Sequence, residues 1–138
     1  MARPYLGGTT GGIKEISSAT TLSLADSGKT ILLSEGSAPY TVTLPAVTNK
    51  GWEATFILVS NSMASANSIT VASISANQMK VIKMPDENSA GNVDLNADAI
   101  VFPHGLTNVL SKATVVSDGS FFITHVTARD FSYVDITN

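Results

Sequence analysis

Short segments in which apolar and polar residues alternate follow one another along most of the chain. In residues 40–44, Tyr40, Val42 and Leu44 fall on one face of an extended backbone and two threonines fall on the other, which is the period of two that predicts a β-strand. Comparable segments, or short apolar runs between turn residues, occur at residues 21–24, 30–33, 52–59, 68–71, 79–84, 99–102, 113–116 and 121–126. No segment sustains the period of a helix, so we expect an all-β fold, an antiparallel sandwich of the jelly-roll kind or a barrel.

Two of these segments carry further information. Residues 56–59 are continuously apolar, which is typical of a strand that is covered on both faces. Asp118-Gly119 lies between the apolar runs 113–116 and 121–126. This arrangement is a strong signal for a β-hairpin.

The two ends of the chain differ from its middle. Residues 1–16 contain two glycine pairs, yet they also carry Tyr5, Leu6, Ile13 and Ile16. The segment is either a frayed terminus or an arm that becomes ordered against a partner. We expect an extended N-terminal arm over residues 1–16, a β domain over residues 17–128 and a polar C-terminal tail over residues 129–138.

The composition narrows the range of functions. Charged residues make up 14% of the 138 residues, with 8 Lys and Arg against 11 Asp and Glu and a formal net charge of -3. Because the basic residues are scattered, nucleic acid is not expected as a partner. The lack of cysteine excludes disulfides, zinc–thiolate sites and thiol nucleophiles. No apolar run has the length of a signal-peptide core or a membrane span, so we expect a soluble protein without an ordinary export signal or membrane partner.

Gly28-Lys29-Thr30 has the form in which a phosphate-binding loop ends. Such a loop needs a glycine five positions before Gly28, where this chain has Ser23, and it leads into a helix. Here three apolar residues follow and then more turn residues. We therefore interpret the segment as a turn before a strand, with Asp26 and Gly28 serving the backbone geometry.

The other polar clusters are incomplete as reactive or metal-binding sites. Residues 94–98 alternate oxygen ligands as a calcium loop does, but the glycine and the glutamate that such a loop requires further on are replaced. His104 and His125 have no partner at metal-ligand spacing, and no nucleophile-elbow pattern supports a catalytic triad. Most acids lie at turns, whereas Glu53 lies in a strand and is the acid most worth locating. We expect no catalytic residue, no metal site, no cofactor and no enzymatic activity.

The order of these segments resembles that of the small head decoration (cement) proteins of tailed phages. The similarity lies in LADSGKT at residues 24–30, TVTLPA at residues 41–46, KGW at residues 50–52 and VVSDGSFFI at residues 115–123. The opening MARPYLGGT also looks like the start of such proteins in marine podoviruses. The resemblance extends over most of residues 1–126, although it leaves residues 60–92 unmatched.

The resemblance implies a structural protein of the virion that sits on the outer capsid surface and stabilises the head by bridging major capsid subunits. It implies a homotrimer whose partners are the major capsid protein and further copies of itself. The arm residues expected to contact the capsid are Arg3, Pro4, Tyr5, Leu6, Ile13 and Ile16. The residues expected at the oligomer interface are Trp52, Glu53, His125, Phe131 and Tyr133.

Two other functions compete with this one. The first is a tail-fibre or appendage β domain that binds a receptor or a glycan, because Thr-Leu-Pro-Ala and Ser-Asp-Gly strands also occur in such domains. The second is a hydrolase on a jelly-roll scaffold, which would need two acids, or a histidine and a nucleophile, in one pocket. Nothing in the sequence indicates such a pair.

Overall fold

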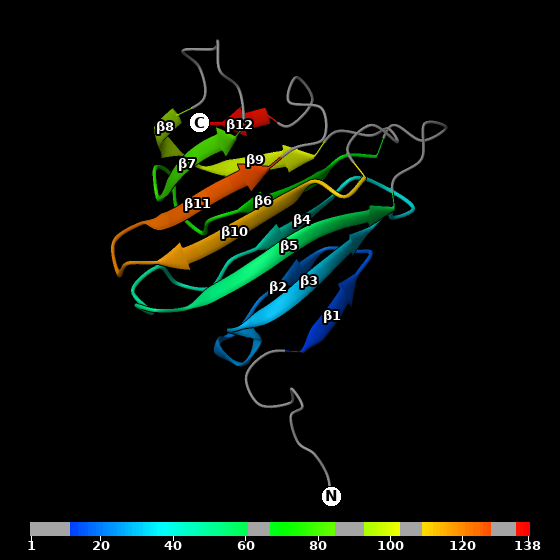
Figure 1. Cartoon of the computed structure of the whole chain (residues 1–138), viewed down its shortest axis with the longest axis horizontal. Helices are drawn as coiled ribbons and strands as arrows, with labels where there is room; N and C mark the ends of the chain where they lie inside the picture. Colours follow the sequence, from blue (N-terminus) through cyan, green and yellow to red (C-terminus); the bar gives the residue numbers. More distant parts are fainter. Residues whose placement is uncertain (1–11, 61–66, 85–92, 103–108, 128–134) are drawn as a thin grey trace, which may run out of the picture.

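The computed structural model describes residues 12–60, 67–84, 93–102, 109–127 and 135–138, and these form a sandwich of two β-sheets (Figure 1). One sheet has seven strands in the order β1-β3-β5-β10-β11-β7-β8, and the other has five in the order β12-β9-β6-β4-β2. The expected all-β class is confirmed. The strands are β1 (Ile13–Ile16), β2 (Thr20–Thr21), β3 (Lys29–Ser34), β4 (Tyr40–Thr43), β5 (Glu53–Ser60), β6 (Ile69–Ala72), β7 (Met79–Met84), β8 (Val93–Ala97), β9 (Ala99–Phe102), β10 (Lys112–Ser117), β11 (Phe122–Thr127) and β12 (Asp135–Thr137), and one short 3-10 helix, η1 (Leu24–Asp26), precedes β3.

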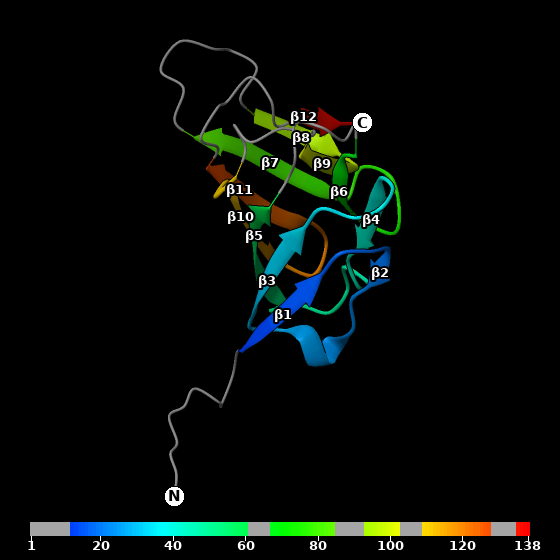
Figure 2. The same ribbon diagram turned by 90° about the vertical axis from the view of Figure 1, so that its right-hand side faces the viewer.

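The first half of the chain winds back and forth between the two sheets. Strands β1, β3 and β5 enter the seven-stranded sheet, and β2, β4 and β6 enter the five-stranded sheet, so each successive pair forms one coil stacked on the last (Figure 2). The β10–β11 hairpin then fills the space between β5 and β7 in the larger sheet. The result is a stack of parallel coils that an antiparallel hairpin extends.

This winding corrects one detail of the expected fold, because the strands are not all antiparallel. Neighbours β1/β3, β3/β5, β2/β4, β4/β6 and β7/β11 are parallel, while the other described pairs are antiparallel. A parallel pair needs a crossover before the chain returns in the same direction. For the first four of these pairs, the intervening strand in the opposite sheet serves as the crossover.

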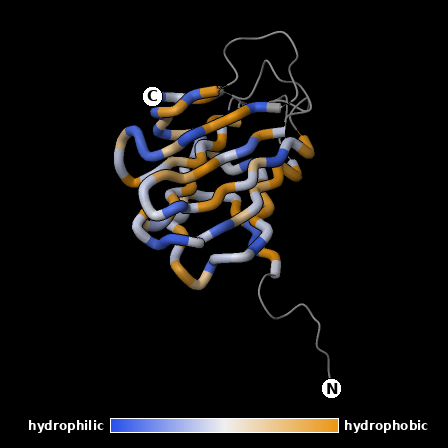
Figure 3. Tube along the Cα trace, turned by 60° about the vertical axis from the view of Figure 1, so that its left-hand side comes forward, coloured by the Kyte–Doolittle hydropathy of each residue, from blue (hydrophilic) through white to orange (hydrophobic). Residues whose placement is uncertain are grey.

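The core lies between the two sheets and is built from every second residue of each strand. In β5 the burial alternates, with Phe56 and Leu58 fully buried and Ile57 and Val59 partly exposed. Figure 3 shows the same recurrence of apolar positions along neighbouring strands. The largest fully buried side chains are Phe56, Phe102, Phe122, Ile31, Leu33, Leu44, Leu58, Ile69, Met79, Ile100, Val42 and Val71.

The continuous apolar run in β5 predicted a strand covered on both faces, and the described structure covers only one. The inward face of β5 meets the second sheet, whereas no described helix or strand lies over the outward face that carries Ile57 and Val59 (Figure 2).

The β domain extends further towards both ends of the chain than the sequence predicted. β1 is an integral strand that pairs with β3, and Ile16 at its end is 4% exposed and belongs to the core. β12 pairs with β9, and Ile136 packs against the core from there. The two segments belong to the domain because their apolar residues complete the inward stacks at the sheet edges. Residues 1–11 and 128–134 lie outside the described part of the chain.

The predicted hairpin at Asp118-Gly119 is confirmed, because β10 and β11 pair in register from Lys112↔Thr127 to Ser117↔Phe122. Gly119 has a φ of 98°, a conformation that side chains disfavour. The Asp118 carboxylate accepts hydrogen bonds from the backbone N–H groups of Phe121, at 2.7 Å, and Ser120, at 2.8 Å. These bonds lower the pKa of Asp118 and hold the turn.

Tyr40 links the first coil, formed by β1 and β2, to the second, formed by β3 and β4. Its buried hydroxyl lies 2.6 Å from the carbonyl oxygen of Ser34 at the end of β3 and 3.1 Å from that of Ile16 at the end of β1. Burial raises the pKa of Tyr40 to about 12 and outweighs the opposing effect of the hydrogen bond to Ser34. Gly36 lies against the same ring: a Cβ there would come within 2.6 Å of the Ser17 carbonyl oxygen and 3.0 Å of Tyr40 Cδ1.

We predict that Gly36→Ala destabilises the fold. The added methyl group would press on the Ser17 backbone oxygen and push Tyr40 away from its hydrogen-bond acceptors, and such overpacking costs roughly 1–3 kcal/mol. Urea unfolding of Gly36→Ala and of the exposed neighbouring control Ser37→Ala measures the difference. Equal free energies of unfolding for the two variants would contradict this account.

Candidate functional site

The Gly28-Lys29-Thr30 segment is a turn that leads into β3, as predicted. No helix follows it, and the N–H of Gly28 donates to the carbonyl of Glu53 at 2.8 Å. The Lys29 ammonium group is directed back to the Asp26 carboxylate at 3.0 Å. The groups that would hold a phosphate in a nucleotide-binding loop are therefore engaged with the protein itself.

Asp26 has a role that the sequence interpretation missed, because it is the centre of a buried ionic cluster. Its side chain is 4% exposed, and its Oδ1 lies 3.0 Å from both Lys14 Nζ and Lys29 Nζ. Its Oδ2 accepts a hydrogen bond from the backbone N–H of Ser23 at 2.9 Å, which caps η1. The cluster joins β1, η1 and β3, and the sequence separation of Lys14 from Asp26 left no local signal for it.

The residues expected to bind partners fall into three groups. Glu53 and His125 are exposed on the outward side of the seven-stranded sheet, and Ile13 is 69% exposed at its edge. Trp52 was expected at the oligomer interface and Ile16 at the capsid contact, and both placements are corrected. The two side chains are 3% and 4% exposed and belong to the core. Arg3, Pro4, Tyr5, Leu6, Phe131 and Tyr133 lie outside the described residues, and so does His104.

Trp52 is buried because it closes the end of the sandwich. Its indole N–H donates to the Ser23 carbonyl at 3.0 Å, and its ring meets Phe122 edge-on with the centroids 6.3 Å apart. The sequence shows an aromatic residue at the start of a strand, and such a residue serves a core or an interface equally well.

Residues 94–98 form most of strand β8 and the turn after it, and they do not wrap an ion. Asp94 Oδ1 accepts from the N–H of Asn96 at 2.8 Å, and Asp98 Oδ1 accepts from the N–H of Asn77 at 2.5 Å. Within the described ranges, no three His, Asp or Glu side chains converge as a metal site. These carboxylates stabilise turns in this structure.

The largest feature that could meet a partner is the outward side of the seven-stranded sheet, which we call the open face. Strand register arranges its side chains in three rows that run across the sheet. The central row is Ile13, Thr30, Thr55, Thr114, His125, Ile82 and Val93; one flanking row is Glu53, Val116, Ile123 and Lys80, and the other is Glu15, Leu32, Ile57, Lys112 and Thr127.

Part of the open face is distinctly apolar, and the sequence interpretation did not find it. Ile82, Val93, Leu95 and Ile123, together with Lys80, line a shallow pocket of about 160 Å³. Val93 and Leu95 are 54% and 58% exposed. The alternation of Val93 and Leu95 was the available signal, but the polar residues Asp94 and Asn96 that alternate with them matched the pattern of a cation loop instead.

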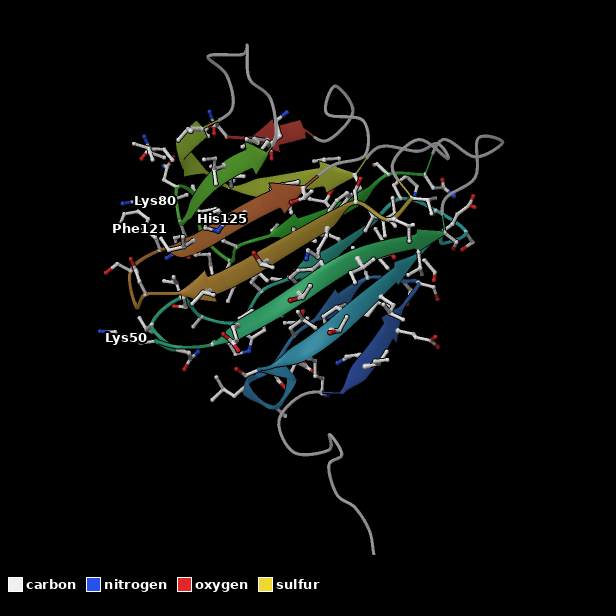
Figure 4. All side chains as sticks on the ribbon, viewed as in Figure 1. Lys50, Lys80, Phe121 and His125 are labelled. Carbon is white, nitrogen blue, oxygen red and sulfur yellow. The ribbon has the colours of Figure 1, made fainter. Side chains whose placement is uncertain are left out.

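The ring of Phe121 borders this region and makes a cation–π contact with the Lys80 ammonium group. Lys80 Nζ lies 4.0 Å from the ring centroid, and Figure 4 shows Lys80, Phe121 and His125 on the same side of the sheet. This contact holds the long Lys80 side chain near the hairpin turn.

Comparison with known proteins adds no assignment. No protein-family model matches the chain, and no curated protein is significantly similar to it. Among the described residues, no helix has the length and hydropathy needed to cross a membrane.

The pKa of Asp26 predicts an acid-sensitive fold. Burial alone would raise this pKa, but the Ser23 N–H and the ammonium groups of Lys14 and Lys29 lower it to about 2. The unfolded carboxyl titrates near pH ~3.9, so the cluster stabilises the fold by roughly 2 kcal/mol above that pH. This contribution is lost as the pH falls from about 4 to about 2.

Urea unfolding between acidic and neutral pH tests this prediction with Asp26→Asn and, as a control outside the cluster, Glu35→Gln. Asp26→Asn should be less stable than the wild type at neutral pH and should lose less stability on acidification. Parallel pH profiles for the wild type and Asp26→Asn would show that the cluster contributes nothing.

Proposed function

We propose that this protein is a non-enzymatic decoration protein of a phage capsid, which binds the outer capsid surface and stabilises the head by bridging major capsid subunits. The similarity of its turn and strand segments to head decoration proteins supports the kind of partner. The open face supports the mode of action, because its rows of aliphatic and threonine side chains suit contact with other proteins.

The observation that carries the proposal concerns β5, whose sequence is that of a strand buried on both faces although only one of its faces is covered. Residues 56–59 have the apolar character of a strand buried on both sides, yet Ile57 and Val59 are partly exposed and no described element lies over them. A partner that covers the open face would complete this burial.

The N-terminal segment supplies a second contact in this proposal. β1 fixes the chain at the edge of the large sheet, and residues 1–11 precede it with Arg3, Tyr5 and Leu6. A segment tethered at a rigid edge binds at high effective concentration once the domain has docked. Several weak contacts made by each copy of the protein then add up to stable binding to the capsid.

Deletion of residues 2–11 tests the role of this segment. The cut spares β1, because removal of Ile16 would open the core. We expect the truncated protein to unfold at the same urea concentration as the full chain and to bind undecorated capsids at least about tenfold more weakly, as expected when a linked second contact is lost. Occupancy is measured by co-sedimentation with purified capsids.

Two outcomes would count against the proposal. Unchanged occupancy of the truncated protein would remove the arm from the mechanism. Failure of the full chain to bind any capsid, combined with binding to a glycan array, would favour the tail-appendage function instead.

A further inference from the structure

The charges on the open face are separated by sign. Glu15 and Glu53 lie on β1 and β5, in the half of the sheet that the first coils form, whereas Lys80 lies on β7 near the other edge. Lys112 lies between them, on β10. No described residue forms an ion pair with the Glu53 carboxylate. A surface that carries acids on one side and lysines on the other is suited to meet a copy of itself turned around.

The geometry points to the open face as a two-fold interface between two copies of this chain. The axis would pass midway between β10 and β11 and run about 15° from the strand direction, which is half the angle at which packed sheets cross. It would exchange β10 with β11, β5 with β7 and β3 with β8. This inference goes beyond the proposed function. A second copy and a capsid subunit would occupy the same face, so the dimer would be the form of the protein that is not bound to a capsid.

The strand register makes this arrangement complementary. Glu53, Val116, Ile123 and Lys80 occupy one row on β5, β10, β11 and β7. The axis therefore places Glu53 of one copy opposite Lys80 of the other, and Val116, which is 40% exposed, opposite Ile123. In the central row, Thr114 falls opposite His125.

Sheet twist does not remove these pairs. Packed sheets cross at about 30°, which separates positions that lie far from the axis. Glu53 and Lys80 each lie one and a half strand spacings from it, or about 7 Å. At that radius the crossing displaces the two groups by only about 4 Å, which long side chains can span. Farther out, Ile13 and Glu15 remain at the rim.

The open face is large enough for a specific but weak interface. The six strands that the axis pairs, each about 4.8 Å wide and with about five residues in the sheet, give roughly 30 Å by 17 Å, or roughly 500 Å² per copy. Two such faces bury roughly 1,000 Å², which is at the lower limit for a specific interface. We therefore expect a reversible dimer with a micromolar or weaker dissociation constant.

The two-fold arrangement differs from the trimer that the sequence resemblance implied. A flat face packs against its own copy isologously, and an isologous contact closes with two copies. The dimer would leave β1 of each copy at its outer edge, so each dimer would present two N-terminal segments.

Charge reversal with rescue tests the interface. We expect sedimentation equilibrium of the full chain, from micromolar to millimolar concentration, to show a monomer–dimer equilibrium. Glu53→Lys and Lys80→Glu should each raise the dissociation constant about tenfold or more, because each places like charges opposite each other. The double variant E53K/K80E should return to within about threefold of the wild type, because the pair is restored with its signs exchanged.

Controls separate this effect from misfolding and from net charge. Thr41→Lys adds a charge on the outward side of the five-stranded sheet, where Thr41 is exposed, and should leave the equilibrium unchanged. Thermal unfolding checks that each variant is folded. A monomer at all concentrations, a trimer, or a double variant as weak as the single variants would overturn the inference, whether or not the protein binds capsids.

Discussion

The structure depends on the in-register stacking of inward-facing side chains between coils. Ile16 lies beside Leu33 and Leu33 beside Leu58 in the larger sheet, while Val42 lies beside Val71 in the smaller one. Each return of the chain must therefore bring back an apolar residue at the same height. Because side chains alternate between faces, this inward register also fixes the outward one, and the threonine row of the open face is a direct consequence.

The first coil needs more than apolar stacking, because it has a neighbour on one side only. Its strands are short, and β1 carries two charged residues between its two isoleucines. The Asp26 cluster and the Tyr40 hydroxyl compensate for this: the first draws Lys14 towards η1 and β3, and the second lies beside the carbonyl oxygens that end β1 and β3. Polar contacts are thus concentrated where the hydrophobic stack is thinnest.

Local patterns predicted the elements well and their partners poorly. The alternation in residues 40–44 and the Asp118-Gly119 turn report on backbone geometry that neighbours in sequence determine, and both predictions are confirmed. Strand direction and the burial of Ile16 and Trp52 depend on contacts far along the chain. The alternation of apolar and polar residues in a strand is the same whether its neighbour is parallel or antiparallel. The coiled path of the chain could therefore not be predicted from the sequence. The open face was hidden for the same reason, since its rows appear only once the register is known.

Both edges of the large sheet are poorly suited to edge-to-edge association. β1 places Lys14 and Glu15 at one edge, and β8 is joined to β7 through an irregular register and carries Asp94 at the other. Charged residues and bulges at edges are devices that prevent strands of different molecules from pairing. The face between the edges has the opposite character, with aliphatic and threonine side chains across the strands. Association through the face therefore buries exposed apolar side chains without breaking backbone hydrogen bonds between the strands. It also leaves the N-terminal edge of the sheet free for a different partner.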